Sequence, residues 1–493
     1  MPGLPADRIQ ATVACILGNV LLRLGNSATG VLLGLVLASM NRSGSSVRPI
    51  TIGILAISFY ATELLGAPVF GVFSDRYGRR IFMIAGPVFG AVAIQFIGWP
   101  TALVAWPVVL APMVLGRMLE GFSTATSAPA TLSFLTRETA ESPAVRGQVM
   151  AWYEVATVVG IGGGFVAGGL LWDHIRLGAF VAITGVYLAS LFCFWQVRDR
   201  GSRRPAGAQG LGQQAGAPEG EASLAPLISV MRLARRPRVL RFVPAWLAVN
   251  TIIGVWFTHS TFQLTGGQRS GQALAGAFSG TSLGGAFILF GVAFIVGVVL
   301  WGRALGTMRK TTVMLATVVG IFLICGALLG INHINARDHS WLGWFVAVFL
   351  IGVAVVSGFT PAALAYLADI SEETVRQRGA VMGLYSVILG LGQMAGGALG
   401  SPFAAAAGVD GLIMVTAILG AVAFAAVFAL RRFEEAQARS HVRLSIEAPS
   451  ASAPPVSLQS APLDGLASPR NSDGDRGSPP PAGARDTLAD SNI

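Results

Sequence analysis

The stretch Gly71-Val72-Phe73-Ser74-Asp75-Arg76-Tyr77-Gly78-Arg79-Arg80 decides the fold, because it places a short charged turn between two long apolar segments. Residues 50–70 carry one charged side chain, Glu63, and residues 81–104 carry none. A helix of about 20 apolar residues crosses the hydrocarbon core of a bilayer, and short loops rich in Arg face the cytoplasm. The stretch therefore predicts a tight cytoplasmic turn between two membrane helices.

A plain stop-transfer cluster is the alternative interpretation of this turn. It would account for the three Arg side chains, which only set the topology of the chain. It would not account for Gly71, Asp75 and Gly78 at these spacings. We therefore favour a turn with a function of its own.

The composition points to a protein that crosses the membrane many times. The chain has 493 residues, of which 53% are apolar and only 12% are charged, whereas soluble domains carry about 25% charged residues. The three cysteines, Cys15, Cys193 and Cys325, lie far apart, each within an apolar segment. This spacing predicts no disulfide framework and no metal site, and we expect no cofactor.

The apolar runs predict twelve membrane spans, and the basic residues predict their orientation. The expected spans are about 11–40, 48–70, 81–101, 105–135, 148–172, 178–197, 240–264, 274–301, 311–331, 342–368, 379–402 and 411–431. The loops and ends on the side of the N-terminus hold 27 of the 34 basic residues, and the opposite loops hold five. By the positive-inside rule, both termini are expected in the cytoplasm, and we expect the protein in the cell inner (plasma) membrane. The net charge of +10 then indicates anionic lipid, and not nucleic acid, as the polyanionic partner.

The chain divides into two halves that repeat each other. We expect an N-terminal six-helix bundle at 1–197, a cytoplasmic loop at 198–239, a C-terminal six-helix bundle at 240–432 and a disordered cytoplasmic tail at 433–493. A shift of 232 residues aligns Pro129 with Pro361, Arg146-Gly147 with Arg378-Gly379, Tyr153 with Tyr385, and the glycines 160, 164 and 168 with 392, 396 and 400. A match of these residue types in one register predicts two parallel repeats.

The order Gly-x-x-x-Asp-Arg-x-Gly-Arg-Arg, with two parallel repeats of six helices, resembles the major facilitator superfamily over about residues 8–432. The resemblance implies two pseudo-symmetric bundles that rock about a central cavity lined by the first, fourth, seventh and tenth helices. It assigns a gating motif to Gly71, Asp75, Arg76, Gly78, Arg79 and Arg80. The second half has a degenerate copy of this motif, Gly302 to Lys310, which lacks the Asp. The role of Asp75 is therefore confined to one half.

Polar and charged side chains inside the spans are the site candidates, because each buried charge costs about 3 kcal/mol in the membrane. The candidates for the substrate cavity are Asn19, Arg23, Asn26, Thr124, Asn250, His259, Ser357 and Thr360. Asn19, Arg23 and Asn26 share one face of a helix. For His259 we favour a hydrogen-bonding role over proton relay.

Three residues are the candidates for proton coupling: Arg117, Glu120 and Glu63. The segment from Arg117 to Gly121 resembles the Arg-x-x-x-Gly element that is linked to proton coupling in the family. A static pair between Arg117 and Glu120, three residues apart, is the alternative. Glu63 precedes Asp75 by 12 residues, or about 18 Å of helix, so it lies near the bilayer centre. It could carry a proton or form a fixed ion pair with Arg23, and both interpretations stay open.

Two features of the fifth span bear on mechanism. Gly160, Gly164 and Gly168, like their second-half twins, predict a close approach between helices, either at a sliding seam between the two halves or as plain packing. Family exporters often carry a Gly-Pro element here, whereas in this chain Gly164 is followed by Phe165. That difference weakens the case for an exporter.

The sequence predicts a secondary transporter, not an enzyme. It contains no Gly-x-x-x-x-Gly-Lys-[Ser/Thr] motif, so we expect a gradient to drive transport. Proton-coupled antiport that exports a small organic molecule is the first interpretation, and proton symport of an organic anion is the second. A non-transporting membrane sensor ranks third. The expected partners are a small-molecule substrate, protons and lipid, and we expect a monomer.

Overall fold

The protein is built almost entirely from helices. The computed structural model describes residues 6–139, 143–197, 237–305, 307–334, 340–372 and 378–447. Within these ranges, one isolated bridge between Arg269 and Gln272 is the only β pairing. The expected all-α class is confirmed. Residues 198–236 of the predicted loop at 198–239 and the tail beyond 447 lie outside the described residues, and the last three loop residues belong to a helix that begins at Pro237.

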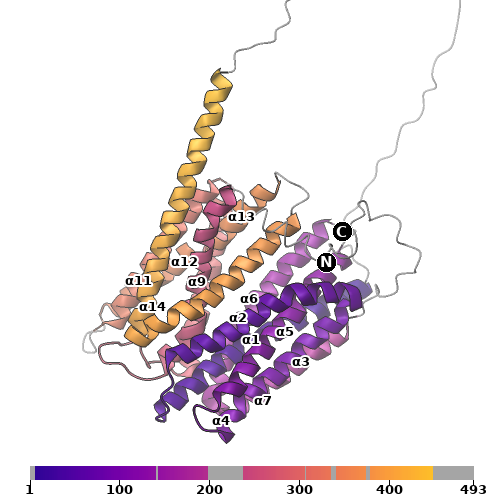
Figure 1. Cartoon of the computed structure of the whole chain (residues 1–493), viewed down its shortest axis with the longest axis vertical. Helices are drawn as coiled ribbons and strands as arrows, with labels where there is room; N and C mark the ends of the chain where they lie inside the picture. The colour runs from indigo at the N-terminus through magenta and orange to yellow at the C-terminus, as the bar shows by residue number, and fades with distance from the viewer. Residues whose placement is uncertain are drawn as a thin grey trace, which may run out of the picture. The chain divides into compact units, whose positions relative to one another are not determined.

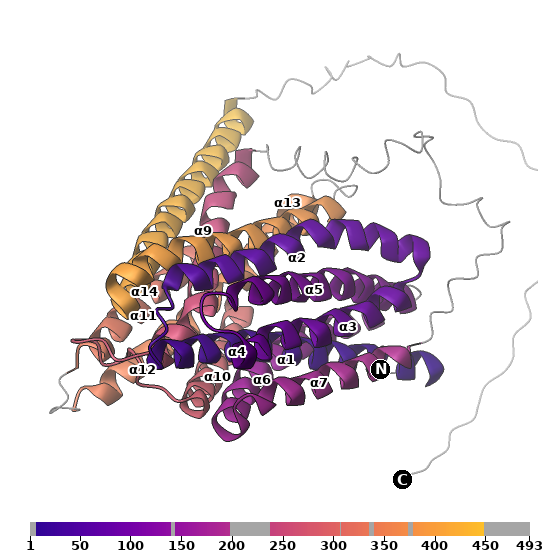
Figure 2. The ribbon, with the colours of Figure 1, turned by 60° about the horizontal axis from the view of Figure 1, so that its bottom comes forward.

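The first half contains six long helices and one short one. They are α1 (Ala6–Arg42), α2 (Pro49–Tyr77), α3 (Arg79–Gly98), α4 (Pro100–Leu103), α5 (Leu110–Glu138), α6 (Pro143–Ile175) and α7 (Gly178–Trp195). Helix α1 packs against α6 and α7, and α5 packs against both α2 and α3 (Figures 1 and 2). Consecutive long helices run antiparallel, as short loops between membrane spans require.

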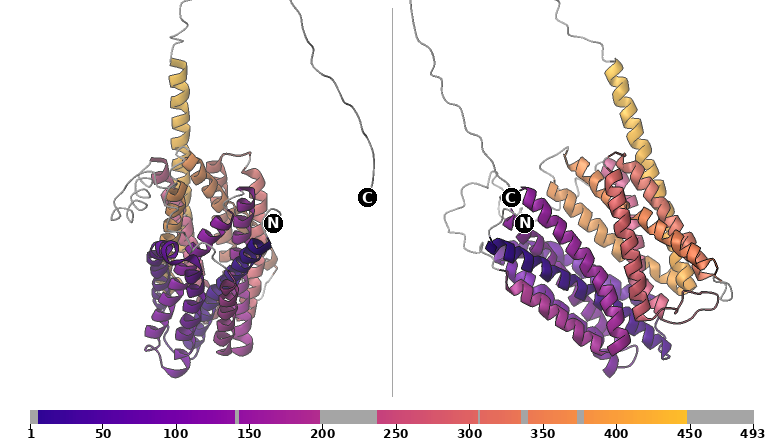
Figure 3. Two further views of the ribbon diagram at one scale, coloured as in Figure 1. Left: turned by 90° about the vertical axis from the view of Figure 1, so that its right-hand side faces the viewer. Right: turned by 180° about the vertical axis from the view of Figure 1, so that it is seen from behind.

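The second half follows the same plan. Its helices are α9 (Pro237–Thr265), α10 (Gly280–Ala304), α11 (Lys310–Asn332), α12 (Leu342–Val356), α13 (Phe359–Glu372) and α14 (Arg378–Glu447). Gly408 interrupts α14 with φ 59° and ψ −129°, so that this element is two helices joined at a sharp bend. Figure 3 shows the second-half helices, from pink to orange, grouped beside those of the first half.

Ten helices in the described residues are long and apolar enough to cross a membrane. Helix α5 is not among them, because Arg117, Glu120 and many hydroxyl side chains lower its hydropathy. The last of the ten covers 53 residues and contains the bend at Gly408. The predicted count of twelve requires that α5 crosses and that the last span is two, so the count stays a prediction.

The tenth predicted span appears as one candidate membrane span, Leu342–Leu367, but a turn at residues 357–358 interrupts its helix. The sequence predicts one helix over 342–368, whereas α12 ends at Val356 and α13 begins at Phe359. Pro361 has no N–H group to donate to the carbonyl of Ser357, four residues earlier. Gly358 faces the ring of Trp301, which a Cβ atom at this position would overlap. Pro129, the counterpart of Pro361, lies inside the continuous helix α5.

The predicted end of the last span also needs correction. The expected disordered tail begins at 433, but α14 continues to Glu447. The residues after 432 favour helix because they are mostly Glu, Ala, Gln and Arg. Nε of Arg431 also donates to Oε1 of Glu435 at 3.0 Å, four residues along the helix.

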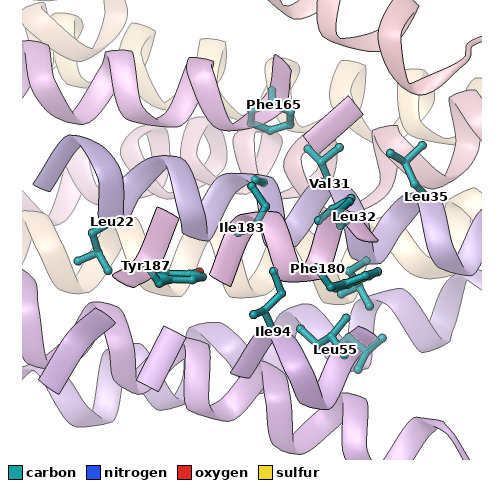
Figure 4. Packing of buried hydrophobic residues seen from close by; sticks show 14 of the residues in the cluster. Leu22, Val31, Leu32, Leu35, Leu55, Ile94, Phe165, Phe180, Ile183 and Tyr187 are labelled. Carbon is teal, nitrogen blue, oxygen red and sulfur yellow. The ribbon is translucent and has the colours of Figure 1, made fainter. Parts of the chain in front are cut away.

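The core of the first half is an apolar cluster that joins α1, α3 and α7 (Figure 4). Leu22, Ile94 and Tyr187 are buried in it. Cβ atoms at Gly25 and Gly90 would collide with the Tyr187 ring from α1 and from α3. In a membrane, where lipid is as apolar as a side chain, such close packing is what holds helices together.

The two glycine ladders also pack closely, and each does so within its own half. Cβ atoms at Gly160, Gly164 and Gly168 of α6 would press on the backbone of α1, at the carbonyl oxygens of Val20, Leu24 and Ala28. Cβ atoms at their twins Gly392 and Gly396 would press in the same way on the backbone of α9, and one at Gly400 would press on the His259 ring of that helix. The expected close approach is confirmed, and its partners are the first helix of each repeat.

Candidate functional site

The charged turn at the end of α2 is fixed to helices of its own half. Gly78 has φ 103°, which favours glycine. Nε of Arg79 donates to Oγ of Ser133 in α5 at 2.6 Å. Nη2 of Arg80 donates to the carbonyl oxygen of Trp195 at 2.6 Å, and its guanidinium lies 5.4 Å from the centre of that ring.

The other motif residues lie along the last turns of α2. A Cβ atom at Gly71 would lie 3.8 Å from Pro129 of α5, so the two helices are close there. The guanidinium of Arg76 lies 5.6 Å from the centre of the Tyr77 ring. Asp75 belongs to the helix, and its side chain lies outside the described residues.

A buried ion pair lies at the crossing of α2 and α5. Nη1 of Arg117 donates to Oε2 of Glu120, and these side chains are 10% and 2% exposed. Nε of Arg117 donates to the carbonyl oxygen of Leu55 at 3.4 Å. The guanidinium also lies 4.5 Å from the centre of the Phe59 ring, a cation–π distance. The charge of Arg117 is therefore shared between a carboxylate, a carbonyl and an aromatic face.

Gly121 explains why α2 and α5 can cross so closely. A Cβ atom there would overlap Oγ1 of Thr62 and the carbonyl oxygen of Phe59. The Arg-x-x-x-Gly spacing thus places the cation one turn from the contact that brings α2 within its reach. The static-pair interpretation of Arg117 and Glu120 agrees with this geometry, and so does a role in coupling.

Glu63 lies next to the pair without joining it. Its carboxylate interacts electrostatically with Arg23 of α1 and with Arg117. In the described part of the chain, no ion pair within 4.0 Å joins Glu63 to Arg23. Nε of Arg23 is buried and has no hydrogen-bond partner there. Glu154 of α6 also interacts electrostatically with Arg23.

The polar residues of α1 connect it to three neighbouring helices. Nδ2 of Asn19 donates to Oγ1 of Thr157 in α6 at 3.0 Å. Nδ2 of Asn26 donates to Oγ1 of Thr124 in α5, also at 3.0 Å. The hydroxyl of Tyr187 in α7 donates to Oδ1 of Asn26 at 2.9 Å. The candidates Asn19, Asn26 and Thr124 are thus hydrogen-bonded within the first half.

The second-half candidates do not form a comparable network. Asn250 donates to the carbonyl oxygen of Trp246 in its own helix at 2.8 Å. Nε2 of His259 lies 3.1 Å from the carbonyl oxygen of Gly397, so this buried ring bonds α14 as expected. The hydroxyl of Ser357 donates to the carbonyl oxygen of Ala354 at 2.8 Å, and Thr360 is half-buried in α13.

Several residues around the site were not identified from the sequence. Tyr187, Phe59 and Thr157 are ordinary residues in apolar spans, and only the fold shows which side chains they contact. A lone Tyr in an otherwise apolar span was a usable signal, since a buried hydroxyl needs a partner. Within the described ranges, no group of three His, Cys, Asp or Glu side chains is placed to hold a metal ion.

Comparisons with known proteins agree on the fold. The model of the Major Facilitator Superfamily matches residues 15–280 and 270–463. The structure is similar to that of the nucleoside transporter NupG, with a TM-score of 0.64, 12% identity, and coverage of 87% of this chain and 99% of the other. It is also similar to the human organic anion transporter MFSD10 (TETRAN), with a TM-score of 0.55, 20% identity, and coverage of 86% and 100%.

Two multidrug resistance proteins of Bacillus subtilis (strain 168) are similar in sequence. Multidrug resistance protein 1 is 27% identical over 184 residues, which are 37% of this chain and 43% of that protein. Multidrug resistance protein 2 is 23% identical over 367 residues, 73% of this chain and 80% of that one. With the family model matched in both halves, and with solved transporters sharing its fold, the chain belongs to the major facilitator superfamily.

Proposed function

We propose that this transporter exports a small organic molecule in exchange for protons. The observation that carries the proposal is a charged cluster in the first half. There two cations, the half-buried Arg23 and the buried Arg117, face the carboxylates of the half-buried Glu63 and the buried Glu120. Charged groups at this depth are costly unless they are paired or functional. The Arg117–Glu120 bond satisfies one carboxylate and leaves Glu63 to exchange its proton.

Glu63 is the group best suited to couple two fluxes. It interacts with both cations but is bonded to neither, so small movements of α1 or α5 change the charge it faces. Protonation removes a negative charge from the membrane interior and leaves Arg23 to interact with other groups. In antiport, substrate and proton exclude one another at this cluster, and each therefore lowers the affinity for the other by the same factor.

Likeness to multidrug resistance proteins supports export, although the first of them is matched over less than half its length. The charge count supports cytoplasmic termini in an inner (plasma) membrane. On this orientation, α1 and α6 end on the outside, and the turn that contains Asp75 faces the cytoplasm. The protein works as a monomer, because each half supplies its own repeat to the pair that alternating access needs.

Asp75 is the gating residue in this proposal. The basic residues that follow it are fixed to α5 and α7, so the turn moves with the first half. The second-half copy of the motif has no acidic residue. In this proposal, Asp75 interacts with the second half when the cytoplasmic side closes.

Uptake of an organic anion with protons is the second candidate function. The unpartnered Nε of Arg23 favours it, because a guanidinium that lacks partners can bind a carboxylate or a phosphate. An anion bound to Arg23 would neutralise the positive charge that faces Glu63. The ionised form of Glu63 would then be less stable, so Glu63 would bind a proton more readily. Substrate and proton would then move together.

Transport into everted membrane vesicles distinguishes the two functions. A library of organic cations, neutral compounds and organic anions is supplied to vesicles with and without a pH gradient in which the lumen is acidic. Antiport predicts accumulation that collapses when a protonophore removes the gradient. Symport predicts accumulation in right-side-out vesicles with an acidic exterior, and absence of any pH effect in both preparations would contradict both functions.

A further inference from the structure

The described contacts between the two halves gather at one end of the molecule. We call it the distal end, where α1 and α6 finish and α10 begins. Nη1 of Arg42 at the end of α1 donates to the carbonyl oxygen of Thr265 at the end of α9. A Cβ atom at Gly53 of α2 would overlap the hydroxyl of Ser401 in α14.

The closest of these contacts lies between α6 and α10. A Cβ atom at Gly169 would overlap the carbonyl oxygen of Gly280, and one at Gly280 would lie 2.5 Å from that of Gly169. Further along the same pair of helices, the centres of the Phe165 and Phe287 rings lie 4.0 Å apart. Phe165, where family exporters often have Pro, thus continues the contact toward the middle of the molecule.

A carboxylate of the first half completes the first turn of a helix in the second half. Oδ1 of Asp173 accepts from the backbone N–H of Gly280 at 3.2 Å, and Oδ2 accepts from that of Thr281 at 2.7 Å. Ser279 is the N-cap of α10, and its hydroxyl accepts from the N–H of Ser282 at 3.1 Å. The cap of α10 therefore satisfies one of its free N–H groups, while Asp173 satisfies two.

We propose that Asp173 is a latch that holds the two halves together at the distal end and is released when that end opens. A carboxylate at a helix N-terminus gains both from the N–H groups and from the helix dipole. Separation of α6 from α10 must break both hydrogen bonds, and water must then replace them at the carboxylate and at the two N–H groups. The pairing thus stabilises the conformation that is closed at this end, and it does so independently of which substrate is moved.

The matching contact between α2 and α14 has no such latch in the described residues. The hydroxyl of Ser401 donates to the carbonyl oxygen of Gly397 in its own helix at 2.8 Å and not to α2. Close packing alone brings Gly53 of α2 to α14 there. The two sides of the distal end are therefore held differently, by packing on one side and by packing with a charge-assisted pair on the other.

Spin-label distances at the distal end test the latch without any transport assay, so the result does not depend on the proposed function. Labels are placed at Ile175 and Ala277, which are both exposed, after Cys15, Cys193 and Cys325 are replaced by Ala. Double electron–electron resonance then measures the ratio of short to long distances in detergent micelles or nanodiscs.

Two variants remove opposite partners of the latch. Asp173→Asn keeps the shape of the side chain and removes its charge, and Thr281→Pro removes the N–H donor at the second residue of α10, where the N–H has no partner inside the helix. We expect each to raise the population of the long distance about threefold to tenfold, the range for loss of a typical hydrogen bond, because the pair is partly exposed to water. Asp369→Asn is the matched control, because its partner Lys310 lies in the same half.

The proposal is overturned if both variants give the distance distribution of the parent protein. It is also overturned if Asp369→Asn produces the same shift, because loss of any carboxylate would then have this effect. A variant that fails to fold does not stop the test, since the two variants change different halves and either one gives the answer.

Discussion

Nδ2 of Asn26 in α1 lies 3.0 Å from Oγ1 of Thr124 in α5, and the amide donates a hydrogen bond to the hydroxyl. The same Asn26 accepts from Tyr187 through Oδ1, and Tyr187 also lies 3.1 Å from the hydroxyl of Thr29. Three helices of the first half thus meet at one amide. The position of α1, which also carries Arg23, depends on this junction.

Tyr187→Phe removes the donor to Asn26 and leaves the ring between α1 and α3. We expect a loss of about 1–2 kcal/mol in the free energy of unfolding, because Oδ1 of Asn26 then has one partner fewer. Thermal denaturation in detergent measures the change. Tyr77→Phe is the control, since Tyr77 is exposed, and an equal change in both variants would contradict the prediction.

Variants of the charged cluster are expected to keep substrate exchange but to lose its coupling to protons. Glu63→Gln and Glu120→Gln should leave substrate exchange intact and remove its dependence on the pH gradient. Arg117→Lys should also lose coupling, because Lys keeps the charge but lacks the planar fork of donors. Counterflow and pH-driven accumulation in proteoliposomes measure the two properties separately. If all three variants still concentrate substrate against its gradient when pH is imposed, the charges are structural pairs.

Asp75→Asn is expected to reduce the transport rate strongly without affecting membrane insertion. The neutral amide keeps the size of the side chain and loses the charge that the gate is proposed to need. Initial rates are compared at equal protein levels in the membrane. A rate equal to that of the parent protein would rule out a gating role for this carboxylate. The degenerate second-half motif offers the control Thr307→Ala, which should change the transport rate only a little.

Gly121→Ala should destabilise the protein, because its Cβ would overlap Thr62 and the carbonyl oxygen of Phe59. Overpacking of this kind costs about 1–3 kcal/mol, and the backbone oxygen cannot rotate away. Gly162→Ala is the matched control: it lies in a helix with nothing within 4 Å of its Cβ position. There Ala should be neutral or stabilising. Midpoints of thermal unfolding compare the two, and a larger loss in the control would refute the assignment.

Much of the helical plan was predictable because lipid restricts what a chain can do. Long apolar runs, short charged loops and the repeat at Pro129 and Pro361 indicated the helices and their pairing in two sets. The exceptions arise where local chemistry outweighs hydropathy. Pro361 and Gly358 break the tenth span, and helix-forming residues after 432 extend the last one.

The site was predictable in its charges but not in its bonds. Arg117 and Glu120 stand out in the sequence, because a charge inside a span is rare and costly. Their contacts with Phe59 and Leu55 depend on how α2 crosses α5, which no periodicity encodes. Asp173 lies at the end of a span, where a charge needs no special reason, so its partners 107 and 108 residues away could not be inferred.

The break at Ser357–Gly358 makes the two repeats mechanically unequal. Helix α5 continues through Pro129 without an interruption, although the proline removes one hydrogen bond of its ladder, so a push at one end is transmitted along its axis. In the second half, the same position is a joint at which α13 can pivot on α12, as a hinge between two helical segments allows. We expect the two halves to bend by different amounts in each transport cycle. In the first half α5 moves as one rigid helix, and in the second half α13 changes its angle to α12.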